Sequence, residues 1–255
     1  MDYILGFVSL TGDTEKSDLL VNIAASLARC EKRVLLVDLA FPVPALDLLC
    51  GVAEERVYTA ADVGAGRVAL SRAVLPVSLK KGRTVLKDRL SVLAGSPLEA
   101  LTADELRSLL AAVRGATEYD LAIVSFSGEP LTREGLDALF LLTGTDEASL
   151  RSAEARAPLM NADAFLLTGY PTDWDSLCEL PLPAAIVERL GIPVFGIVPC
   201  SPTGLTGILE GCARSRSYLC AVRNVSNRIL GTSVPLLTGV SFFGIGRRRI
   251  LAKAK

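Results

Sequence analysis

A short polar turn near the N-terminus holds the residues whose types and spacing could bind phosphate. The segment Leu10–Ser17 reads LTGDTEKS and lies between an apolar run and a helical pattern. In the phosphate-binding pattern G-x-x-x-x-G-K-[ST], the lysine reaches the phosphates and the hydroxyl binds Mg²⁺. Lys16 and Ser17 match these two positions, whereas Leu10 and Glu15 replace the two framing glycines. The candidate nucleotide residues are Gly12, Asp13, Thr14, Glu15, Lys16, Ser17, Asp18 and Asp38, with Ser17 as the magnesium ligand.

Two properties of this turn oppose phosphate binding. Glycine permits positive φ and close approach of the backbone to phosphate, and the bulky side chains of Leu10 and Glu15 do not. The carboxylates of Asp13, Glu15 and Asp18 also lie near the site in the sequence. One like-charge pair at about 4 Å costs about 4 kcal/mol at an effective dielectric near 20. Two interpretations follow: Lys16 binds phosphate with Ser17 on Mg²⁺ and Asp38 behind it, or Lys16 pairs with the chain's own acids. The second is favoured, with Glu15, Asp13 or Asp38 as the partner.

The elements that would position this turn alternate between apolar strands and helices. Strand-length runs are predicted at 3–10, 33–39, 121–126, 138–143, 164–168 and 194–198, and helices at 17–29, 102–114, 147–155, 184–190 and 215–230. Thr102 and Glu105 have the spacing of a capping box. This alternation is typical of an α/β protein with a mostly parallel twisted sheet and helices on both faces. We predict one such domain over residues 1–240.

At this point the chain resembles the MinD/ParA family of deviant Walker A ATPases. The family loop K-G-G-V-G-K-T-T aligns without gaps on Thr11–Asp18. Four further segments resemble family motifs in the same order, namely Val34–Asp38 with Pro44–Gly51, Tyr119–Ser125, Leu190–Pro199 and Ile229–Pro235. The resemblance covers nearly the whole chain. It implies a P-loop fold, an ATP- and Mg²⁺-dependent dimer, and attachment to the membrane through a short amphipathic C-terminal helix.

The departures from the family pattern concentrate on catalysis. The signature lysine, which reaches the partner's phosphate across the dimer, falls on Thr11, and the catalytic aspartate falls on Ala40. The Walker B aspartate that supports Mg²⁺ falls on Ser125, and Thr168-Gly169 occupies the region where the family reads adenine with an asparagine. The resemblance therefore implies the scaffold of a nucleotide switch without most of its catalytic groups.

The composition excludes several other kinds of chemistry. The chain has 255 residues, half of them apolar, and no histidine, which rules out Ser/His and Cys/His nucleophile pairs and histidine metal ligands. Its six cysteines include no C-x-x-C pair, as expected of a protein in a reducing cytoplasm. No apolar run reaches the roughly 18 residues that a membrane span needs.

Charge is distributed unevenly along the chain. The last 45 residues contain nine basic residues and no acidic one, whereas the first 210 contain 18 basic and 28 acidic residues. Within the tail 241–255, apolar residues alternate with basic ones, which suits an anionic bilayer surface better than nucleic acid. The candidate membrane residues are Phe242, Phe243, Ile245, Arg247, Arg248, Arg249, Ile250 and Leu251. Docking of this tail on its own domain is the alternative.

The sequence thus predicts a MinD/ParA-like protein whose degenerate site neither holds nor hydrolyses ATP. It would form a homodimer, or a heterodimer with an active paralogue, and would act as an interaction or positioning subunit at the cytoplasmic face of the cell membrane. ATP and Mg²⁺ are its cofactors only under the alternative of an active MinD-type switch ATPase. A ParA-like partitioning protein bound to nucleic acid is the second alternative.

Overall fold

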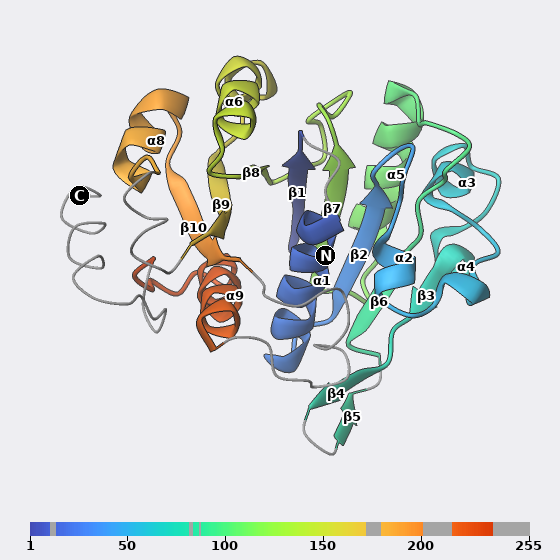
Figure 1. Cartoon of the computed structure of the whole chain (residues 1–255). Helices are drawn as coiled ribbons and strands as arrows, with labels where there is room; N and C mark the ends of the chain where they lie inside the picture. The colour runs from blue at the N-terminus through green and yellow to red at the C-terminus, as the bar shows by residue number, and fades with distance from the viewer. Residues whose placement is uncertain (11–13, 82–83, 87, 172–179, 201–215, 237–255) are drawn as a thin grey trace. The chain divides into compact units, whose positions relative to one another are not determined.

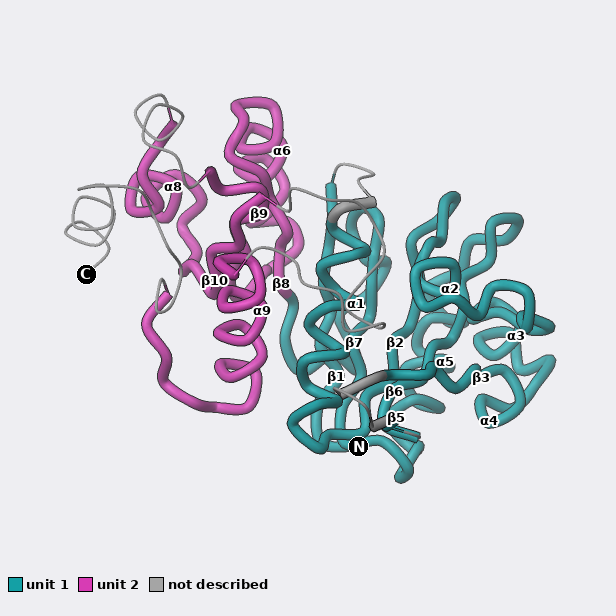
Figure 2. The backbone as a smooth tube through the Cα atoms, turned by 60° about the horizontal axis from the view of Figure 1, so that its bottom comes forward, with its two compact units in different colours: residues 1–139, 205–212 teal, residues 140–204, 213–255 magenta. Residues whose placement is uncertain are grey.

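The chain folds into two compact units in the computed structural model, which describes residues 1–10, 14–81, 84–86, 88–171, 180–200 and 216–236 (Figure 1). The first unit takes its described residues from Met1–Leu139 (Figure 2). The second takes them from 140–204 and 213–255. The single domain over 1–240 stays a prediction, and the tail 241–255 lies outside the described residues.

The first unit is built on a mostly parallel sheet with the strand order β1-β7-β2-β6-β3. Its strands are β1 (Tyr3–Ser9), β2 (Val34–Leu39), β3 (Val74–Pro76), β6 (Leu90–Leu93) and β7 (Leu121–Ser127). The pairs β1–β7, β7–β2 and β2–β6 are parallel, and only the edge strand β3 is antiparallel to its neighbour. Apart from the edge strand β3, these strands are apolar almost throughout and mostly buried, as expected of a sheet covered on both faces.

Helices and a small hairpin complete this unit. They are α1 (Thr14–Arg29), α2 (Leu46–Leu49), the 3₁₀ helix η1 (Ala53–Glu55), α3 (Ala60–Gly64), α4 (Leu70–Ala73), α5 (Ala103–Gly115) and the hairpin of β4 (Leu79–Lys81) with β5 (Thr84–Leu86). Helix α1 packs against β2, β7 and β6 through a continuous set of buried apolar side chains (Figure 1). The predicted capping box of Thr102 and Glu105 opens α5, since each side chain bonds the other residue's backbone N–H.

The described residues of the second unit form three parallel strands and three helices. Strand β9 (Ala164–Tyr170) pairs with β8 (Ala138–Thr143) and β10 (Val194–Pro199). Helices α6 (Glu147–Met160) and α8 (Pro183–Leu190) contact each other, and α9 (Arg216–Ile229) packs against β10. Gly196 permits this last contact, because a Cβ there would lie 2.7 Å from Val225.

The predicted fold class, α/β with a mostly parallel sheet, is confirmed. The observed helix boundaries differ from the predicted ones. Helix α1 begins three residues before the predicted Ser17, and α6 continues to Met160, five residues beyond the predicted end. Helix α6 continues although it contains Pro158, because its last turn buries Met160. Strand β6 has four residues, too few to show a period, and was not predicted.

Candidate functional site

The carboxyl ends of β1, β2 and β7 meet in the first unit, and this is the edge at which open α/β sheets bind their ligands. The candidate loop leads from β1 into α1 at this edge. Thr11, Gly12 and Asp13 lie outside the described residues, and Thr14–Ser17 form the first turn of α1. Backbone N–H groups at a helix start favour anions, so the topology puts the turn where a phosphate could bind.

The side chains that follow in α1 are covered by the fold. Lys16 is 5% exposed and Asp18 is 7% exposed, and Ser17 is half-buried. Asn22 lies one turn further on and donates a hydrogen bond from Nδ2 to Oδ2 of Asp18 at 3.1 Å. Asp18 is thus engaged within its own helix, and Lys16 is enclosed rather than presented to solvent.

Asp38 is the retained acid of the candidate site, and its carboxylate binds the protein's own backbone. The side chain is completely buried. Oδ1 accepts a hydrogen bond from the N–H of Ala40 at 3.0 Å, and Oδ2 accepts from Ala45 and Leu46, each at 2.8 Å. These bonds tie the segment 40–46 to the end of β2. Asp38 is therefore a structural anchor for the loop that leads into α2.

Close packing of Gly95 reinforces this anchor. Gly95 follows β6, and a Cβ at this position would lie 2.6 Å from Cβ of Pro44 and 2.9 Å from the carbonyl oxygen of Asp38. Only glycine allows the backbone after β6 to approach the end of β2 so closely.

The protonation of Asp38 reflects its burial. Desolvation raises the pKa of this carboxyl from its ordinary value of 3.8 to about 6, although the three N–H donors lower it. The charge of Asp47 nearby raises it further. Asp38 is thus ionised at neutral pH and becomes protonated in mildly acidic solution.

This shift predicts a loss of stability as the pH rises. Because the pKa of Asp38 is higher in the folded chain, its stabilisation is complete below about pH 4 and is lost as the pH rises through 6. The difference between the ordinary pKa of 3.8 and the pKa of about 6 in the folded chain corresponds to roughly 3 kcal/mol in the free energy of unfolding. Urea unfolding between pH 4 and 7.5 should show the native chain losing about this much relative to Asp38→Asn. Asp104→Asn, at an exposed carboxylate, should run parallel to the native chain. Parallel curves for Asp38→Asn as well would contradict the prediction.

The positions beside Asp38 that carry family acids, Ala40 and Ser125, supply no carboxylate for a metal ion. Ser125 in β7 is its register partner, so the Walker B position holds a buried hydroxyl directly beside Asp38. Ala40 lies one residue beyond the end of β2. Among the described residues, no cluster of three or more histidine, cysteine or acidic side chains could hold a metal ion.

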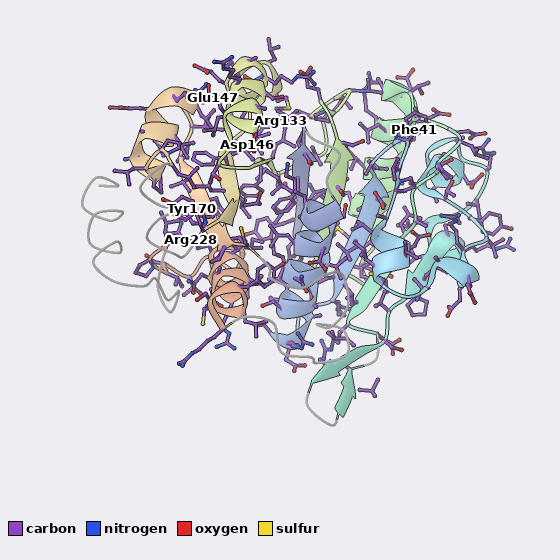
Figure 3. All side chains as sticks on the ribbon, viewed as in Figure 1. Phe41, Arg133, Asp146, Glu147, Tyr170 and Arg228 are labelled. Carbon is purple, nitrogen blue, oxygen red and sulfur yellow. The ribbon has the colours of Figure 1, made fainter. Side chains whose placement is uncertain are left out.

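Other acids that follow strands are used to stabilise the fold. Asp47 is buried and pairs with Arg56 at 2.9 Å. Asp146 accepts a hydrogen bond from the N–H of Ser149 at the start of α6, and Glu147 binds Arg189 at 2.9 Å (Figure 3). Arg189 and Arg151 lower the pKa of Glu147 to about 2. These contacts give Asp47, Asp146 and Glu147 structural roles in the fold.

The predicted adenine and membrane regions lie elsewhere in the chain. Thr168 in β9 donates a hydrogen bond from its hydroxyl to the carbonyl of Thr143 at 3.2 Å, and Gly169 has a positive φ of 68°. The candidate membrane residues Phe242, Phe243, Ile245, Arg247, Arg248, Arg249, Ile250 and Leu251 lie outside the described residues. Within the part that is described, no helix has the length and apolarity to cross a membrane.

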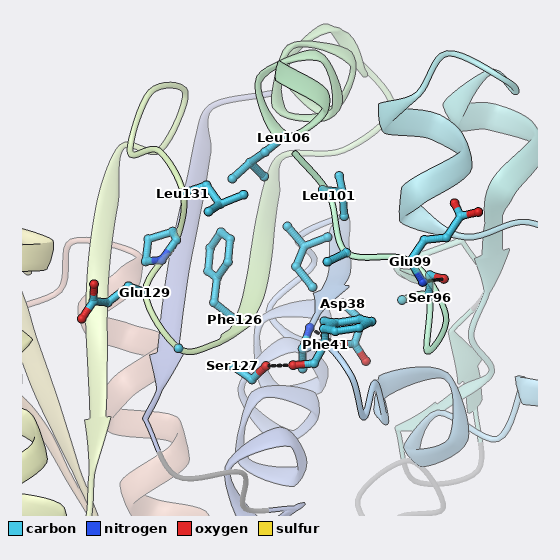
Figure 4. A pocket seen from close by; sticks show the side chains of 16 residues that line it. Asp38, Phe41, Ser96, Glu99, Leu101, Leu106, Phe126, Ser127, Glu129 and Leu131 are labelled. Carbon is cyan, nitrogen blue, oxygen red and sulfur yellow. Dashed lines mark hydrogen bonds between the residues drawn. The ribbon is translucent and has the colours of Figure 1, made fainter. Parts of the chain in front are cut away.

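The structure also forms a cavity that no sequence motif indicates (Figure 4). It has a volume of about 210 Å³ and is enclosed by the ends of β2 and β7, by 95–101 after β6, and by α5. Its lining residues include Phe41, Leu101, Leu106, Phe126 and Leu131. The segments 95–101 and 126–131 come together only in the folded chain. No local sequence pattern indicates that these two segments line a common cavity.

Comparison with known proteins finds a curated relative but no matching family model. No family model matches the chain. The septum site-determining protein MinD of Synechocystis sp. is 23% identical over 250 residues, covering 93% of this chain and 92% of that protein.

Solved structures share the fold. A chain of the MinC:MinD cell division protein complex of Aquifex aeolicus has a TM-score of 0.75 at 21% identity, covering 92% of this chain and 98% of that one. A ParA family ATPase from Chlorobium tepidum has a TM-score of 0.62 at 19% identity, covering 94% and 96% respectively.

Proposed function

This chain belongs to the MinD/ParA family, and from that premise we propose that it is a member with a degenerate nucleotide site. It neither holds nor hydrolyses ATP, and it acts as a dimerising subunit that binds or positions other proteins at a membrane surface. The relative from Aquifex aeolicus occurs in a MinC:MinD complex, so a protein-binding role has a precedent on this fold.

The observation that carries this proposal is the engagement of Asp38 with three backbone amides. In the MinD/ParA resemblance, acids at the ends of the second strand and of the Walker B strand support Mg²⁺ and catalysis. Here Ala40 and Ser125 supply no charge, and both oxygens of Asp38 already accept hydrogen bonds from Ala40, Ala45 and Leu46. A Mg²⁺ ion prefers carboxylates and phosphates as oxygen ligands. The described carboxyl ends of β2 and β7 offer it no carboxylate that is not committed to the fold.

The sequence of the loop supports the same conclusion. Glu15 stands where the family has a glycine, and Asp13 and Asp18 add two more negative charges beside the position of a triphosphate. The remaining cation of the loop, Lys16, is enclosed in the first turn of α1. Repulsion among carboxylates and phosphates therefore opposes binding, and one lysine does not offset it.

Mg-ATP is expected to leave the stability of the protein unchanged. A ligand that binds the folded state stabilises it by RT ln(1 + [L]/Kd), about 2.7 kcal/mol at a hundredfold excess over Kd. Thermal unfolding should therefore be measured with 0 to 5 mM Mg-ATP on the native chain, on Lys16→Ala and on the matched Lys32→Ala. We expect no ligand-dependent shift in any of the three.

Each alternative predicts a result that differs from that of the proposal. A shift that grows with Mg-ATP in the native chain and in Lys32→Ala, but not in Lys16→Ala, would establish an active nucleotide switch and overturn the proposal. A ParA-like role would instead require salt-sensitive DNA binding through the basic C-terminal region. A gel shift at low salt would establish that role, and we expect none.

A further inference from the structure

The cavity of about 210 Å³ at the ends of β2 and β7 has the character of a binding site for one apolar side chain. Pockets for drug-sized ligands have volumes of roughly 300–1,000 Å³, so this cavity is too small for a nucleotide. Aromatic and branched aliphatic side chains from β2, β7, α5 and the adjoining loops form its walls (Figure 4).

Three polar side chains of the lining form hydrogen bonds with the chain's own backbone. The hydroxyl of Ser127 donates a hydrogen bond to the carbonyl of Phe41 at 2.5 Å. The hydroxyl oxygen of Ser96 accepts from the N–H groups of Leu98 and Glu99. Asp38 accepts three backbone hydrogen bonds. A ligand would therefore gain mainly from burying apolar surface here.

Apolar side chains are also exposed at the mouth of the cavity. Phe41 and Leu131 line the cavity and are 41% and 63% exposed. Exposed apolar side chains gathered around a pocket are typical of protein-binding surfaces, where one anchor residue fills the pocket.

The charged side chains of the lining are all acidic. Asp38, Glu99 and Glu129 are among the lining residues, and the described lining contains no lysine or arginine. Glu99, which pairs with Arg67 outside the lining, and Glu129 lie on opposite sides of the mouth (Figure 4). This distribution favours a cationic partner and disfavours phosphate.

The described lining of the cavity includes no residue of the candidate phosphate loop Leu10–Ser17, although it shares Asp38 with the candidate nucleotide residues. Ser125 and Phe126 are consecutive residues of β7, so their side chains point to opposite faces of the sheet. Phe126 lines the cavity together with Leu106 of α5, whereas Ser125 occupies the Walker B position. A ligand in the cavity would not need the loop to be intact.

We propose that this cavity receives a bulky apolar side chain from a partner protein, presented by a segment that carries arginine or lysine beside it. The inference rests on the proposed function in one respect. That function makes the protein an interaction subunit, and the inference names the class of its partner. Binding of Mg-ATP would overturn the proposed function and leave this inference standing, so the two can fail separately.

The test uses a fluorescein-labelled peptide, Ser-Arg-Arg-Phe-Gly-Arg-Ser, titrated with the full chain and followed by fluorescence anisotropy. One control peptide has alanine in place of phenylalanine, and another has glutamate in place of each arginine. We expect saturable binding of the first peptide and roughly ten- to hundredfold weaker binding of the alanine peptide, because one buried aromatic side chain contributes that much. The glutamate peptide should not bind.

Two matched pairs of variants locate the binding on the protein. Leu131→Ser removes part of the cavity wall, and its control Leu159→Ser removes a leucine of similar exposure from α6. Glu129→Lys reverses a charge in the lining, and its control Glu134→Lys reverses one in the same loop outside it. Circular dichroism establishes that each variant is folded. We expect Leu131→Ser and Glu129→Lys to weaken binding at least fivefold and the controls to bind like the native chain. No saturable binding to the native chain, or equal loss in variant and control, would overturn the inference.

Discussion

Replacing Asp38 with alanine is expected to lower the free energy of unfolding by about 4 kcal/mol. The substitution leaves the buried N–H groups of Ala40, Ala45 and Leu46 without an acceptor, and each such group costs about 1–3 kcal/mol. The cost of burying the charge disappears at the same time and offsets part of this loss. Urea unfolding at pH 7 measures the difference.

Two further variants separate the effect of losing these hydrogen bonds from the general effect of removing a carboxylate. Asp38→Asn keeps one acceptor oxygen, so its loss of stability should lie between those of the native chain and Asp38→Ala. Asp104→Ala removes an exposed carboxylate near the start of α5 and should cost less than about 1 kcal/mol. If Asp38→Ala costs no more than Asp104→Ala, Asp38 is not the anchor that its contacts indicate, and the argument against a metal site weakens with it.

Truncation after Ser241 is expected to abolish binding to anionic vesicles. The removed segment carries five basic residues, three of them consecutive at Arg247–Arg249, and two adjacent phenylalanines. Each basic residue near an anionic leaflet contributes about 1 kcal/mol, so the apparent affinity should fall by at least a hundredfold. Sedimentation of the full and the truncated chain with phosphatidylglycerol vesicles at 50 and 300 mM salt measures this effect, and salt should weaken binding of the full chain.

Charge and burial in the tail can be separated by substitution. Changing Arg247, Arg248 and Arg249 to alanine removes charge only, and changing Phe242 and Phe243 to serine removes apolar anchors only. Each set should reduce sedimentation less than the truncation does. Equal sedimentation of the full and the truncated chain would mean that the tail does not attach this protein to membranes, and docking on its own domain would become the better account.

Much of the fold could be predicted because it depends on local patterns. Apolar runs of strand length located β1, β2, β7, β8, β9 and β10, and Thr102 with Glu105 located the start of α5. The motifs in the order of the MinD/ParA family gave the fold class. Strand β6 was missed because its four residues lie in a segment without a clear period. The two compact units were not predicted either, because no change in composition separates residues 139 and 140.

The candidate site could also be predicted only in part from the sequence. The sequence alone determined which chemical groups are available: Lys16 and Ser17 are present, Ala40 and Ser125 carry no charge, and no histidine exists in the chain. Only the tertiary structure decided how Asp38 is used, since its three partners come from a loop whose path is not set by any local pattern. The same holds for the cavity, whose walls come from segments far apart in the chain. Residue types fix the available acids, bases and apolar groups, whereas packing across strands and loops decides which of them remain accessible to a partner.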